Sequence, residues 1–231
     1  METYYFGNND AELVLVQPVD GHDLELMERE CELIRSMTGR EFLLAAVRVG
    51  DWNRGLSPWP APAVFGREDF GGGAGRTLAY IDEELLPRLR AGKNGEKRRF
   101  AIGGYSLAGL FALFAAYRSN AFPLCAAVSP SVWFPGFIDF ARENRIKADA
   151  VYLSLGDREE RTRSPVMARV GGAIRELHSL LESSGTACTL EWNEGNHFRD
   201  SELRTAKGFA WLLNKETPAE PNDITSTSQL R

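Results

Sequence analysis

The sequence predicts an α/β protein built on a doubly wound, mostly parallel sheet with helices on both faces. Two observations lead to this fold class. Short, continuous apolar runs alternate along the chain with amphipathic stretches, which is the pattern of buried parallel strands joined by helices. The chain of 231 residues is also long enough to bury a substantial core. Sequential strands should therefore lie side by side, with helices crossing over between them.

The strands are expected where apolar residues run without interruption, at 13–16, 42–47, 100–102, 125–128, 151–155 and 189–192. Helices are expected between them, where apolar residues recur every three or four positions. The first helix should have Asp23 as its N-cap. Its apolar face should carry Leu24, Met27, Cys31 and Ile34.

The later helices follow the same spacing. One aligns Leu78, Ile81, Leu85 and Leu89, and Pro87 is expected to kink it or end it early. A buried helix is predicted over 107–117, and a closing helix over 201–213. Between these two, Ser164 and Pro165 are a suitable N-cap and first-turn pair for another amphipathic helix.

The chain is predicted to form one domain over 1–215, followed by a disordered tail over 216–231 that has too few apolar residues to offset the entropy of ordering it. The irregular stretch from Gly50 to Gly75 is longer than typical connections, and it is either a lid or pocket wall or a plain excursion. Its glycine run, 71–75, lacks the Gly-Lys-Ser/Thr ending of a phosphate loop and is interpreted as a hinge.

Composition excludes several classes of function. A net charge of -5 without a dense Lys/Arg stripe argues against nucleic-acid binding. No apolar run is long enough to cross a bilayer, and the first residues lack the pattern of a secretory signal, so we expect a cytoplasmic protein that is not bound to a membrane. Cys31, Cys125 and Cys188 lie far apart among apolar residues and are expected to be reduced, with no metal cluster.

The chemistry of the chain concentrates at residues 103–109, Gly-Gly-Tyr-Ser-Leu-Ala-Gly, which join a predicted strand to a predicted helix. A tight turn there needs small residues two positions before and after Ser106, and Gly104 and Ala108 meet this need. The turn would expose the Ser106 hydroxyl, and the Leu107 N–H could stabilise an oxyanion. The alternative interpretation is a glycine-rich strand-to-helix turn with no catalytic role.

A serine nucleophile needs a base, and the chain has three histidines to offer. His178 falls within an amphipathic helix and His22 near the start of another, so both are expected at the surface. His197 follows the last predicted strand. The loop that carries it should lie at the same edge of the sheet as the exposed Ser106 hydroxyl. We therefore predict His197 as the base. An acid to orient it should lie after strand 151–155, where Asp157, Glu159 and Glu160 are all available.

These segments resemble the α/β-hydrolase superfamily up to about Lys215, and within it the chain is similar to enterochelin (siderophore) esterases and esterase D. The residues that carry the resemblance are 103–111, Ser-Leu-Gly-Asp-Arg-Glu-Glu at 154–160 and Gly-Asn-His-Phe at 195–198, supported by 56–60 and 129–133. The resemblance implies a serine esterase that uses no cofactor and no metal. Its usual spacing of the acid after the strand selects Glu159, with Asp157 as runner-up.

Two departures from the family pattern concern the oxyanion hole and the elbow. Ala108 stands where Gly-x-Ser-x-Gly has its second glycine. A His-Gly-Gly segment is also missing after the first strand, and residues 17–23 occupy its place. Pro18 has no N–H to donate, so Val19 or Asp20 is expected to supply the second oxyanion donor.

The predicted pocket and activity follow from these assignments. Four aromatic residues on loops or turns at the catalytic edge are expected to shape the substrate pocket: Trp52, Trp59, Tyr105 and Trp133. The predicted function is hydrolysis of a small-molecule carboxylic ester through an acyl-enzyme on Ser106. An acyltransferase or thioesterase using the same triad, or a noncatalytic binding protein that retains the fold, are the alternatives.

Overall fold

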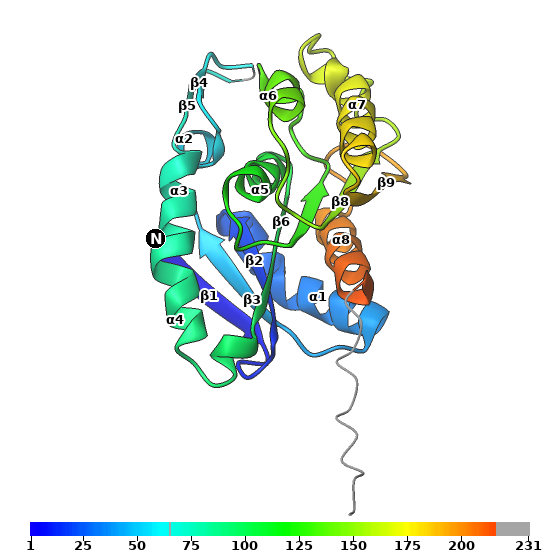
Figure 1. Cartoon of the computed structure of the whole chain (residues 1–231). Helices are drawn as coiled ribbons and strands as arrows, with labels where there is room; N and C mark the ends of the chain where they lie inside the picture. Colours follow the sequence, from blue (N-terminus) through cyan, green and yellow to red (C-terminus); the bar gives the residue numbers. More distant parts are fainter. Residues whose placement is uncertain (65, 216–231) are drawn as a thin grey trace, which may run out of the picture.

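The computed structural model describes residues 1–64 and 66–215, and the predicted tail, 216–231, lies outside the described residues. Within the described chain, seven strands form one sheet in the order β1-β3-β2-β6-β7-β8-β9. All neighbouring pairs are parallel except β1 and β3. The predicted doubly wound, mostly parallel α/β fold is confirmed (Figure 1).

The elements have the following bounds. The sheet strands are β1 (Glu2–Gly7), β2 (Leu13–Val19), β3 (Leu43–Arg48), β6 (Arg99–Tyr105), β7 (Leu124–Val128), β8 (Ala150–Gly156) and β9 (Ala187–Asn193), and a separate small pair is formed by β4 (Pro60–Ala61) and β5 (Phe70–Gly71). The α-helices are α1 (Gly21–Thr38), α2 (Trp52–Leu56), α3 (Ala74–Tyr80), α4 (Leu86–Arg90), α5 (Leu107–Arg118), α6 (Phe137–Glu143), α7 (Val170–Ser183) and α8 (Ser201–Lys215). A π-helical turn (Ile81–Leu85) joins α3 to α4, and 3₁₀ turns lie at Gly95–Lys97 and Met167–Arg169.

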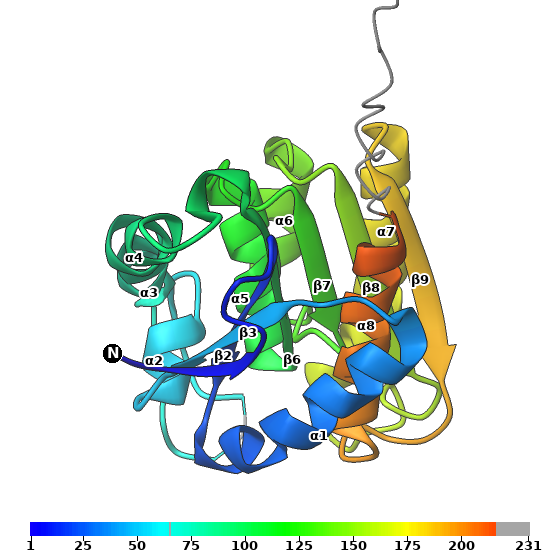
Figure 2. The same cartoon turned by 90° about the horizontal axis from the view of Figure 1, so that it is seen from below.

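Helices cover both faces of the sheet, and each face has its own apolar core (Figures 1 and 2). Helices α1 and α8 pack against each other on one face, where Met27, Ile34 and Phe209 are fully buried. The other face is covered by α2 to α7 and holds the larger core. The two layers shield the central parallel strands, as expected for a sheet of this type.

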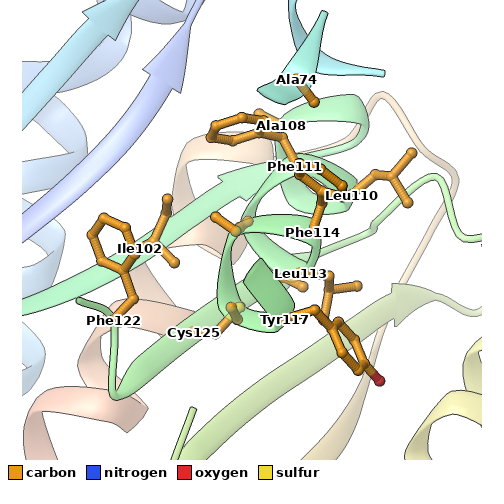
Figure 3. Close-up of a cluster of buried hydrophobic side chains, with 14 of the residues drawn as sticks. Ala74, Ile102, Ala108, Leu110, Phe111, Leu113, Phe114, Tyr117, Phe122 and Cys125 are labelled. Atoms are coloured by element: carbon orange, nitrogen blue, oxygen red, sulfur yellow. The ribbon is translucent and has the colours of Figure 1, made fainter. Parts of the chain in front are cut away.

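Helix α5 lies in the larger core and is buried on every side except near its end at Arg118 (Figure 3). Side chains such as Leu110, Phe111 and Leu113 are fully buried and pack between the sheet and the surrounding helices. A helix that is apolar all round is stable only in such a setting. The predicted buried helix is confirmed, and its N-terminus is held in a fixed position at the carboxyl end of β6.

Two helix predictions need correction. Asp20, not Asp23, is the N-cap of α1, because the Asp20 carboxylate accepts hydrogen bonds from the backbone N–H groups of His22 and Asp23. Pro87 does not end its helix, since α4 continues to Arg90, although a π-helical turn interrupts the regular helix directly before α4. Pro87 stands in the first turn of α4, directly after the π-helical turn, where its missing N–H matters least.

Several elements escaped the sequence prediction. Strand β1 is an antiparallel edge strand in which most residues are not buried, so it shows no apolar run. Helix α6 is short. The predicted helix from Ser164 passes through a 3₁₀ turn at Met167 before α7, while the Ser164 hydroxyl accepts a hydrogen bond from the Met167 N–H at 3.4 Å, as the predicted N-cap would. The glycines of the expected hinge allow close packing, because a Cβ at Gly71 would lie 2.5 Å from Arg54 and one at Gly72 would lie 2.5 Å from Pro60.

Two other expectations concern membranes and cysteines. No helix in the described residues is long and apolar enough to span a bilayer. The three cysteines are free thiols, as predicted. We keep 1–215 as a proposed single domain, because the sheet takes strands from Glu2 to Asn193.

Candidate active site

Four adjacent parallel strands each deliver one residue to the same edge of the sheet. Ser106 follows β6, Ser129 follows β7, Glu159 follows β8 and His197 follows β9, each within four residues of the strand's end. The carboxyl ends of parallel strands meet at one edge, which is where open α/β sheets bind their ligands. Residues far apart in the sequence are thereby brought together.

Ser106 sits in a strained turn between β6 and α5. Its φ of 59° and ψ of -118° place a non-glycine residue in a sparsely populated region of backbone space. Gly104 makes the turn possible, because a Cβ there would lie 2.7 Å from the methyl carbon of Ala108. A Cβ at Gly109 would lie 2.9 Å from the Gly104 carbonyl oxygen. The methyl group of Ala108 therefore fits the elbow as long as residue 104 is glycine.

Ser106, His197 and Glu159 form a continuous chain of hydrogen bonds. The His197 Nε2 lies 2.9 Å from the Ser106 Oγ, and its Nδ1 lies 2.6 Å from the Glu159 Oε2. With the ring proton on Nδ1, the imidazole donates to the carboxylate and accepts from the serine hydroxyl. This arrangement suits a base that removes the serine proton.

The Glu159 carboxylate is held from several sides. The Ser129 hydroxyl and the Gly156 N–H each donate to Oε1 at 2.7 Å, and the Arg204 guanidinium donates to it at 3.2 Å. Burial alone would raise the pKa of Glu159, but the hydrogen bond and charge of His197, with the hydrogen bonds from Ser129 and Gly156, lower it below its ordinary value. Glu159 is therefore ionised at neutral pH, as an imidazole-orienting acid must be.

The other two carboxylates of the same loop lie elsewhere. Asp157 is exposed, and its Oδ1 accepts a hydrogen bond from the Gly195 N–H at 2.8 Å. The Glu160 Oε2 lies 3.3 Å from the Arg175 guanidinium. The structure thus brings Glu159 to His197 and leaves Asp157 and Glu160 away from the ring. Asp157 instead supports the backbone of the loop that carries His197.

Tyr105 and Arg204 extend the hydrogen bonds of His197 and Glu159 into the protein, behind His197 as viewed from the cavity, since neither residue lines it. The Tyr105 hydroxyl donates to the His197 carbonyl oxygen at 2.7 Å, and the Arg204 guanidinium donates to the Tyr105 oxygen at 3.2 Å. Burial raises the pKa of Tyr105, so its hydroxyl stays protonated and able to donate. The Arg204 side chain is only 2% exposed.

The predicted oxyanion donors differ in how they are placed. Leu107 is the first residue of α5, so its N–H has no partner within the helix, and Leu107 lines the cavity described below. Val19 ends β2, and its side chain is buried in the core beneath α1 and α8. The Asp20 carboxylate caps α1. The second oxyanion donor, from Val19 or Asp20, stays a prediction.

A cavity of about 630 Å³ opens in front of Ser106 and His197, larger than the hollow of about 390 Å³ beside α6 and α7. Its volume lies in the range typical of small-molecule sites. The apolar wall includes Trp52, Phe70, Trp133, Met167, Val170 and Phe198. The polar wall includes Asn53, Arg158, Arg161, Thr162 and Asn196. The stretch from Gly50 to Gly75 thus supplies part of a pocket wall.

Two of the four aromatic residues predicted for the pocket do not line this cavity. Trp59 packs beside Phe134 and Phe140, and its indole N–H donates to the Pro135 carbonyl at 2.8 Å. Tyr105 projects from β6 to the opposite layer, as alternation along a strand requires, and packs against the core beneath α1 and α8. Trp52 and Trp133 do line the cavity, as predicted.

Several residues of the site were missed by the sequence reasoning. Phe70, Phe198 and Met167 line the cavity, and Arg204 and Ser129 hold the acid. Phe198 had a usable signal, since an aromatic residue next to His197 on a loop should lie at the catalytic edge. Arg204 had none, because its position within a helix does not reveal that it is buried. No group of three or more His, Cys, Asp or Glu side chains suited to a metal ion occurs among the described residues.

This fold, with a serine at a strained strand-to-helix turn and a hydrogen-bonded histidine and acid, is that of the α/β-hydrolase class. The family model described as "Putative esterase" matches residues 18–196. The chain therefore belongs to this esterase family and is an enzyme, and the predicted resemblance is confirmed.

Solved structures show the same fold. The chain is similar to an IroE-like serine hydrolase from Shewanella oneidensis, with 16% identity, a TM-score of 0.73, and coverage of 92% of this chain and 75% of that one. It is also similar to the siderophore hydrolase EstB from Aspergillus nidulans, with 20% identity, a TM-score of 0.71, and coverage of 94% and 91%. The enterobactin esterase FES from Shigella flexneri matches with 14% identity and a TM-score of 0.65, over 92% of this chain and 55% of that one. No curated protein sequence matches.

Proposed function

We propose that this esterase is a serine-dependent carboxylic ester hydrolase that works through an acyl-enzyme on Ser106. The observation that carries the proposal is the hydrogen-bonded chain from the Ser106 hydroxyl through His197 to Glu159, with distances of 2.9 and 2.6 Å. A serine hydroxyl becomes a nucleophile when an oriented imidazole can take its proton. Both distances fall within the reach that this proton transfer requires.

The proposed reaction has two stages. In the first, the Ser106 Oγ bonds to the ester carbonyl carbon while its proton passes to the His197 Nε2. The tetrahedral intermediate then collapses, the bond to the leaving oxygen breaks, and the alcohol departs with that proton. In the second stage, His197 takes a proton from water as the water attacks the acyl group. Collapse of this intermediate returns the proton to the Ser106 Oγ and releases the carboxylic acid.

The local structure supports each stage. The strained turn holds the Ser106 hydroxyl at the cavity, and the positive end of the α5 dipole faces the position where negative charge develops on the carbonyl oxygen. The Leu107 N–H is our proposed oxyanion donor at that helix end. Glu159 keeps the ring of His197 oriented and offsets the positive charge that the ring gains.

The cavity favours a small-molecule ester with a substantial apolar or aromatic acyl group, because aromatic side chains form much of its wall. Some neighbours in fold are named as siderophore hydrolases and an enterobactin esterase, which makes ester-linked siderophores one class worth including in a substrate screen. A panel of esters and thioesters of increasing acyl size would rank these classes by kcat/KM.

The test is labelling by a fluorophosphonate probe, with Ser131 as a matched control. The Ser131 Oγ lies 3.5 Å from the Ser106 Oγ and also lines the cavity, so it is a competing hydroxyl. We expect the probe to modify Ser106 in the wild type and in Ser131→Ala, as located by peptide mass spectrometry. Ser106→Ala should lose labelling and at least about 10³-fold of its p-nitrophenyl ester hydrolysis, with an unchanged melting temperature. Retained hydrolysis in folded Ser106→Ala would refute the proposal.

A further inference from the structure

Arg204 is a buried arginine with an unusual set of partners, none of which is needed to build helix α8. Its guanidinium donates to the Glu159 Oε1 at 3.2 Å, to the Tyr105 hydroxyl oxygen at 3.2 Å and to the Glu194 carbonyl at 2.9 Å. Arginine is rarely fully buried unless it is paired. A charge in this position must therefore be held by the carboxylate and the two other acceptors.

The partners of Arg204 connect two loops that carry reacting groups. Tyr105 donates to the backbone carbonyl of His197, and Glu159 accepts from the His197 ring. Arg204 joins these two contacts, so the backbone and the ring of His197 are both fixed from one guanidinium. Glu194, whose carbonyl it also holds, lies at the start of the same loop.

The backbone nearby is shaped to admit this arrangement. A Cβ at Gly156 would lie 2.9 Å from the Glu159 Oε1, 3.0 Å from the Arg204 Nη1 and 2.5 Å from the Gly195 carbonyl oxygen. Any larger residue at 156 would push the carboxylate and guanidinium apart. The absence of a side chain at this position lets the ion pair form directly beneath the loop that carries His197.

We propose that Arg204 is a positioning residue, which fixes the Glu159 carboxylate and the His197 loop and balances the charge of Glu159. This inference rests on the proposed serine mechanism. An unbalanced carboxylate would favour the protonated imidazole more strongly, and a protonated imidazole cannot accept the Ser106 proton. With the guanidinium in place, the charge of Glu159 is balanced while its carboxylate still orients the ring.

Other charged groups near His197 do not take the place of Arg204 in balancing the charge of Glu159. Arg158 and Arg161 line the cavity in front of the ring and are exposed. Asp157 is bound to the Gly195 N–H, and the Glu194 carboxylate lies 2.9 Å from Arg199 in an exposed pair. Solvent screens these exposed charges, whereas Arg204 and Glu159 are 2% and 4% exposed and interact with little screening.

The test compares Arg204→Met and Arg204→Lys with the control Arg199→Met. Arg199 is an exposed arginine on the loop that carries His197. For Arg204→Met we expect kcat/KM for p-nitrophenyl butyrate to fall about 10- to 100-fold. The acid limb of the kcat/KM profile should also move to higher pH, because the hydrogen-bonded Glu159–His197 pair loses a neighbouring positive charge. Arg204→Lys should keep the charge and the position of the acid limb but lose part of kcat. Arg199→Met should stay within about twofold of the wild type.

A second variant protects the test against misfolding. Tyr105→Phe keeps the buried ring and removes only the hydroxyl that joins Arg204 to His197. We expect a lower kcat with little change in KM, and thermal unfolding shows that each variant is folded. Wild-type kcat in folded Arg204→Lys and Tyr105→Phe, or an unmoved acid limb in folded Arg204→Met, would overturn the inference. The absence of Ser106-dependent turnover in the wild type would instead count against the proposed function.

A different observation concerns the charge of the cavity itself. Arg158 and Arg161 both line it, on the loop between β8 and α7. The Arg158 Nε lies 3.9 Å from Asp157, at the limit of an ion pair, and no ion pair of Arg161 occurs within residues 1–64 and 66–215. Among those same residues, the one carboxylate on the cavity wall is Glu159, which is already paired with His197. The wall therefore carries excess positive charge.

We infer that the ester substrate carries a carboxylate, which Arg158 and Arg161 bind while the apolar wall receives the rest of the acyl group. Like the Arg204 inference, this one depends on the proposed ester hydrolysis. Guanidinium and carboxylate groups match in geometry and form charge-assisted hydrogen bonds, which are stronger in a partly apolar cavity than in water.

Two esters of similar size test this charge preference. 4-Nitrophenyl hemisuccinate is anionic at neutral pH, and 4-nitrophenyl butyrate is neutral. We expect a kcat/KM about tenfold higher for the hemisuccinate at low salt. The preference should disappear in Arg158→Met/Arg161→Met and persist in Arg163→Met, a control on the same loop outside the cavity wall. Equal rates for the two esters, or a preference unchanged in the double variant, would overturn the inference. Turnover of the butyrate separately reports on the proposed function.

Discussion

The two sides of the His197 ring are built in contrasting ways. Behind the ring, Glu159, Arg204 and Tyr105 form a buried polar network whose members hydrogen-bond to one another. In front of it, the cavity is open and largely apolar, and Phe198 at its wall is 91% exposed. A satisfied buried network specifies one arrangement of its groups, whereas exposed apolar side chains leave surface for a ligand to cover.

This difference separates two kinds of effect. Changes behind the ring should act on the chemical step, because they disturb the orientation and charge of the base. Changes to the apolar side chains in front should act on substrate binding, because these side chains form the wall of the cavity. Measuring kcat and KM separately distinguishes the two.

The largest effect is expected from Glu159→Gln. The amide keeps the size of the side chain but loses the negative charge, and it can favour the wrong tautomer of His197. We expect kcat to fall about 10³- to 10⁴-fold with a smaller change in KM. Steady-state kinetics with a p-nitrophenyl ester measure this. A loss of kcat of less than tenfold in the folded variant would show that the side behind the ring does not control the chemical step.

A smaller effect, on KM rather than on kcat, is expected from Phe198→Ala. This side chain is almost fully exposed, so its removal should leave the melting temperature unchanged. It should raise KM for esters with large apolar acyl groups about five- to tenfold, because contact area with the ligand is lost, and should leave kcat within about twofold. The same variant should show little change with p-nitrophenyl acetate, which serves as the matched substrate control. A fall in kcat with KM unchanged would show that Phe198 acts on the chemical step instead of on substrate binding.

Asp157→Asn should have a smaller effect than either of these. Asp157 lies two residues from Glu159, but its carboxylate accepts from the Gly195 N–H rather than from the His197 ring. An amide oxygen at this position can accept the same hydrogen bond. We expect kcat/KM to stay within about threefold of the wild type. A loss as large as that of Glu159→Gln would show that the acid is misassigned.

The pH dependence of stability provides the subtlest check. The pKa of Glu159 is lowered in the folded protein, so its ionised form stabilises the fold at pH values above its ordinary pKa of 4.5. This contribution should be lost as the pH falls below that value and through the lowered pKa. Glu159→Gln should therefore be less stable than the wild type at pH 7, and the difference should shrink in acid. Urea unfolding of both proteins between pH 3 and 7 measures it, and a gap that is constant with pH would contradict the account.

The sequence predicted the part of the site that depends on local signals. Ser106 could be proposed as the nucleophile because small residues surround it in a strand-to-helix turn, and His197 could be proposed as the base because its two competitors belong to helices. Glu159 was selected only through the resemblance to α/β-hydrolases, because three carboxylates follow β8. The central strands were also predictable, since each is a buried apolar run.

The remainder depends on contacts between distant segments. Nothing in the residues around Arg204 shows that it faces Glu159 rather than water, because burial is decided by the packing of α8. Tyr105 was misplaced because its neighbour is the serine, although alternation along β6 turns its side chain to the other layer. Trp59 was misplaced because the segment that covers it, near Pro135, is distant in sequence. Strand β1 gave no apolar signal because it lies at an edge.

The most direct test of the proposed mechanism is to trap the acyl-enzyme on Ser106. The enzyme is mixed with a p-nitrophenyl ester, quenched with acid during turnover, digested and examined by peptide mass spectrometry. We expect the acyl group on Ser106 in the wild type and in Ser131→Ala, and no acyl group in Ser106→Ala. An acyl group carried by another residue while the ester is being hydrolysed would contradict the account.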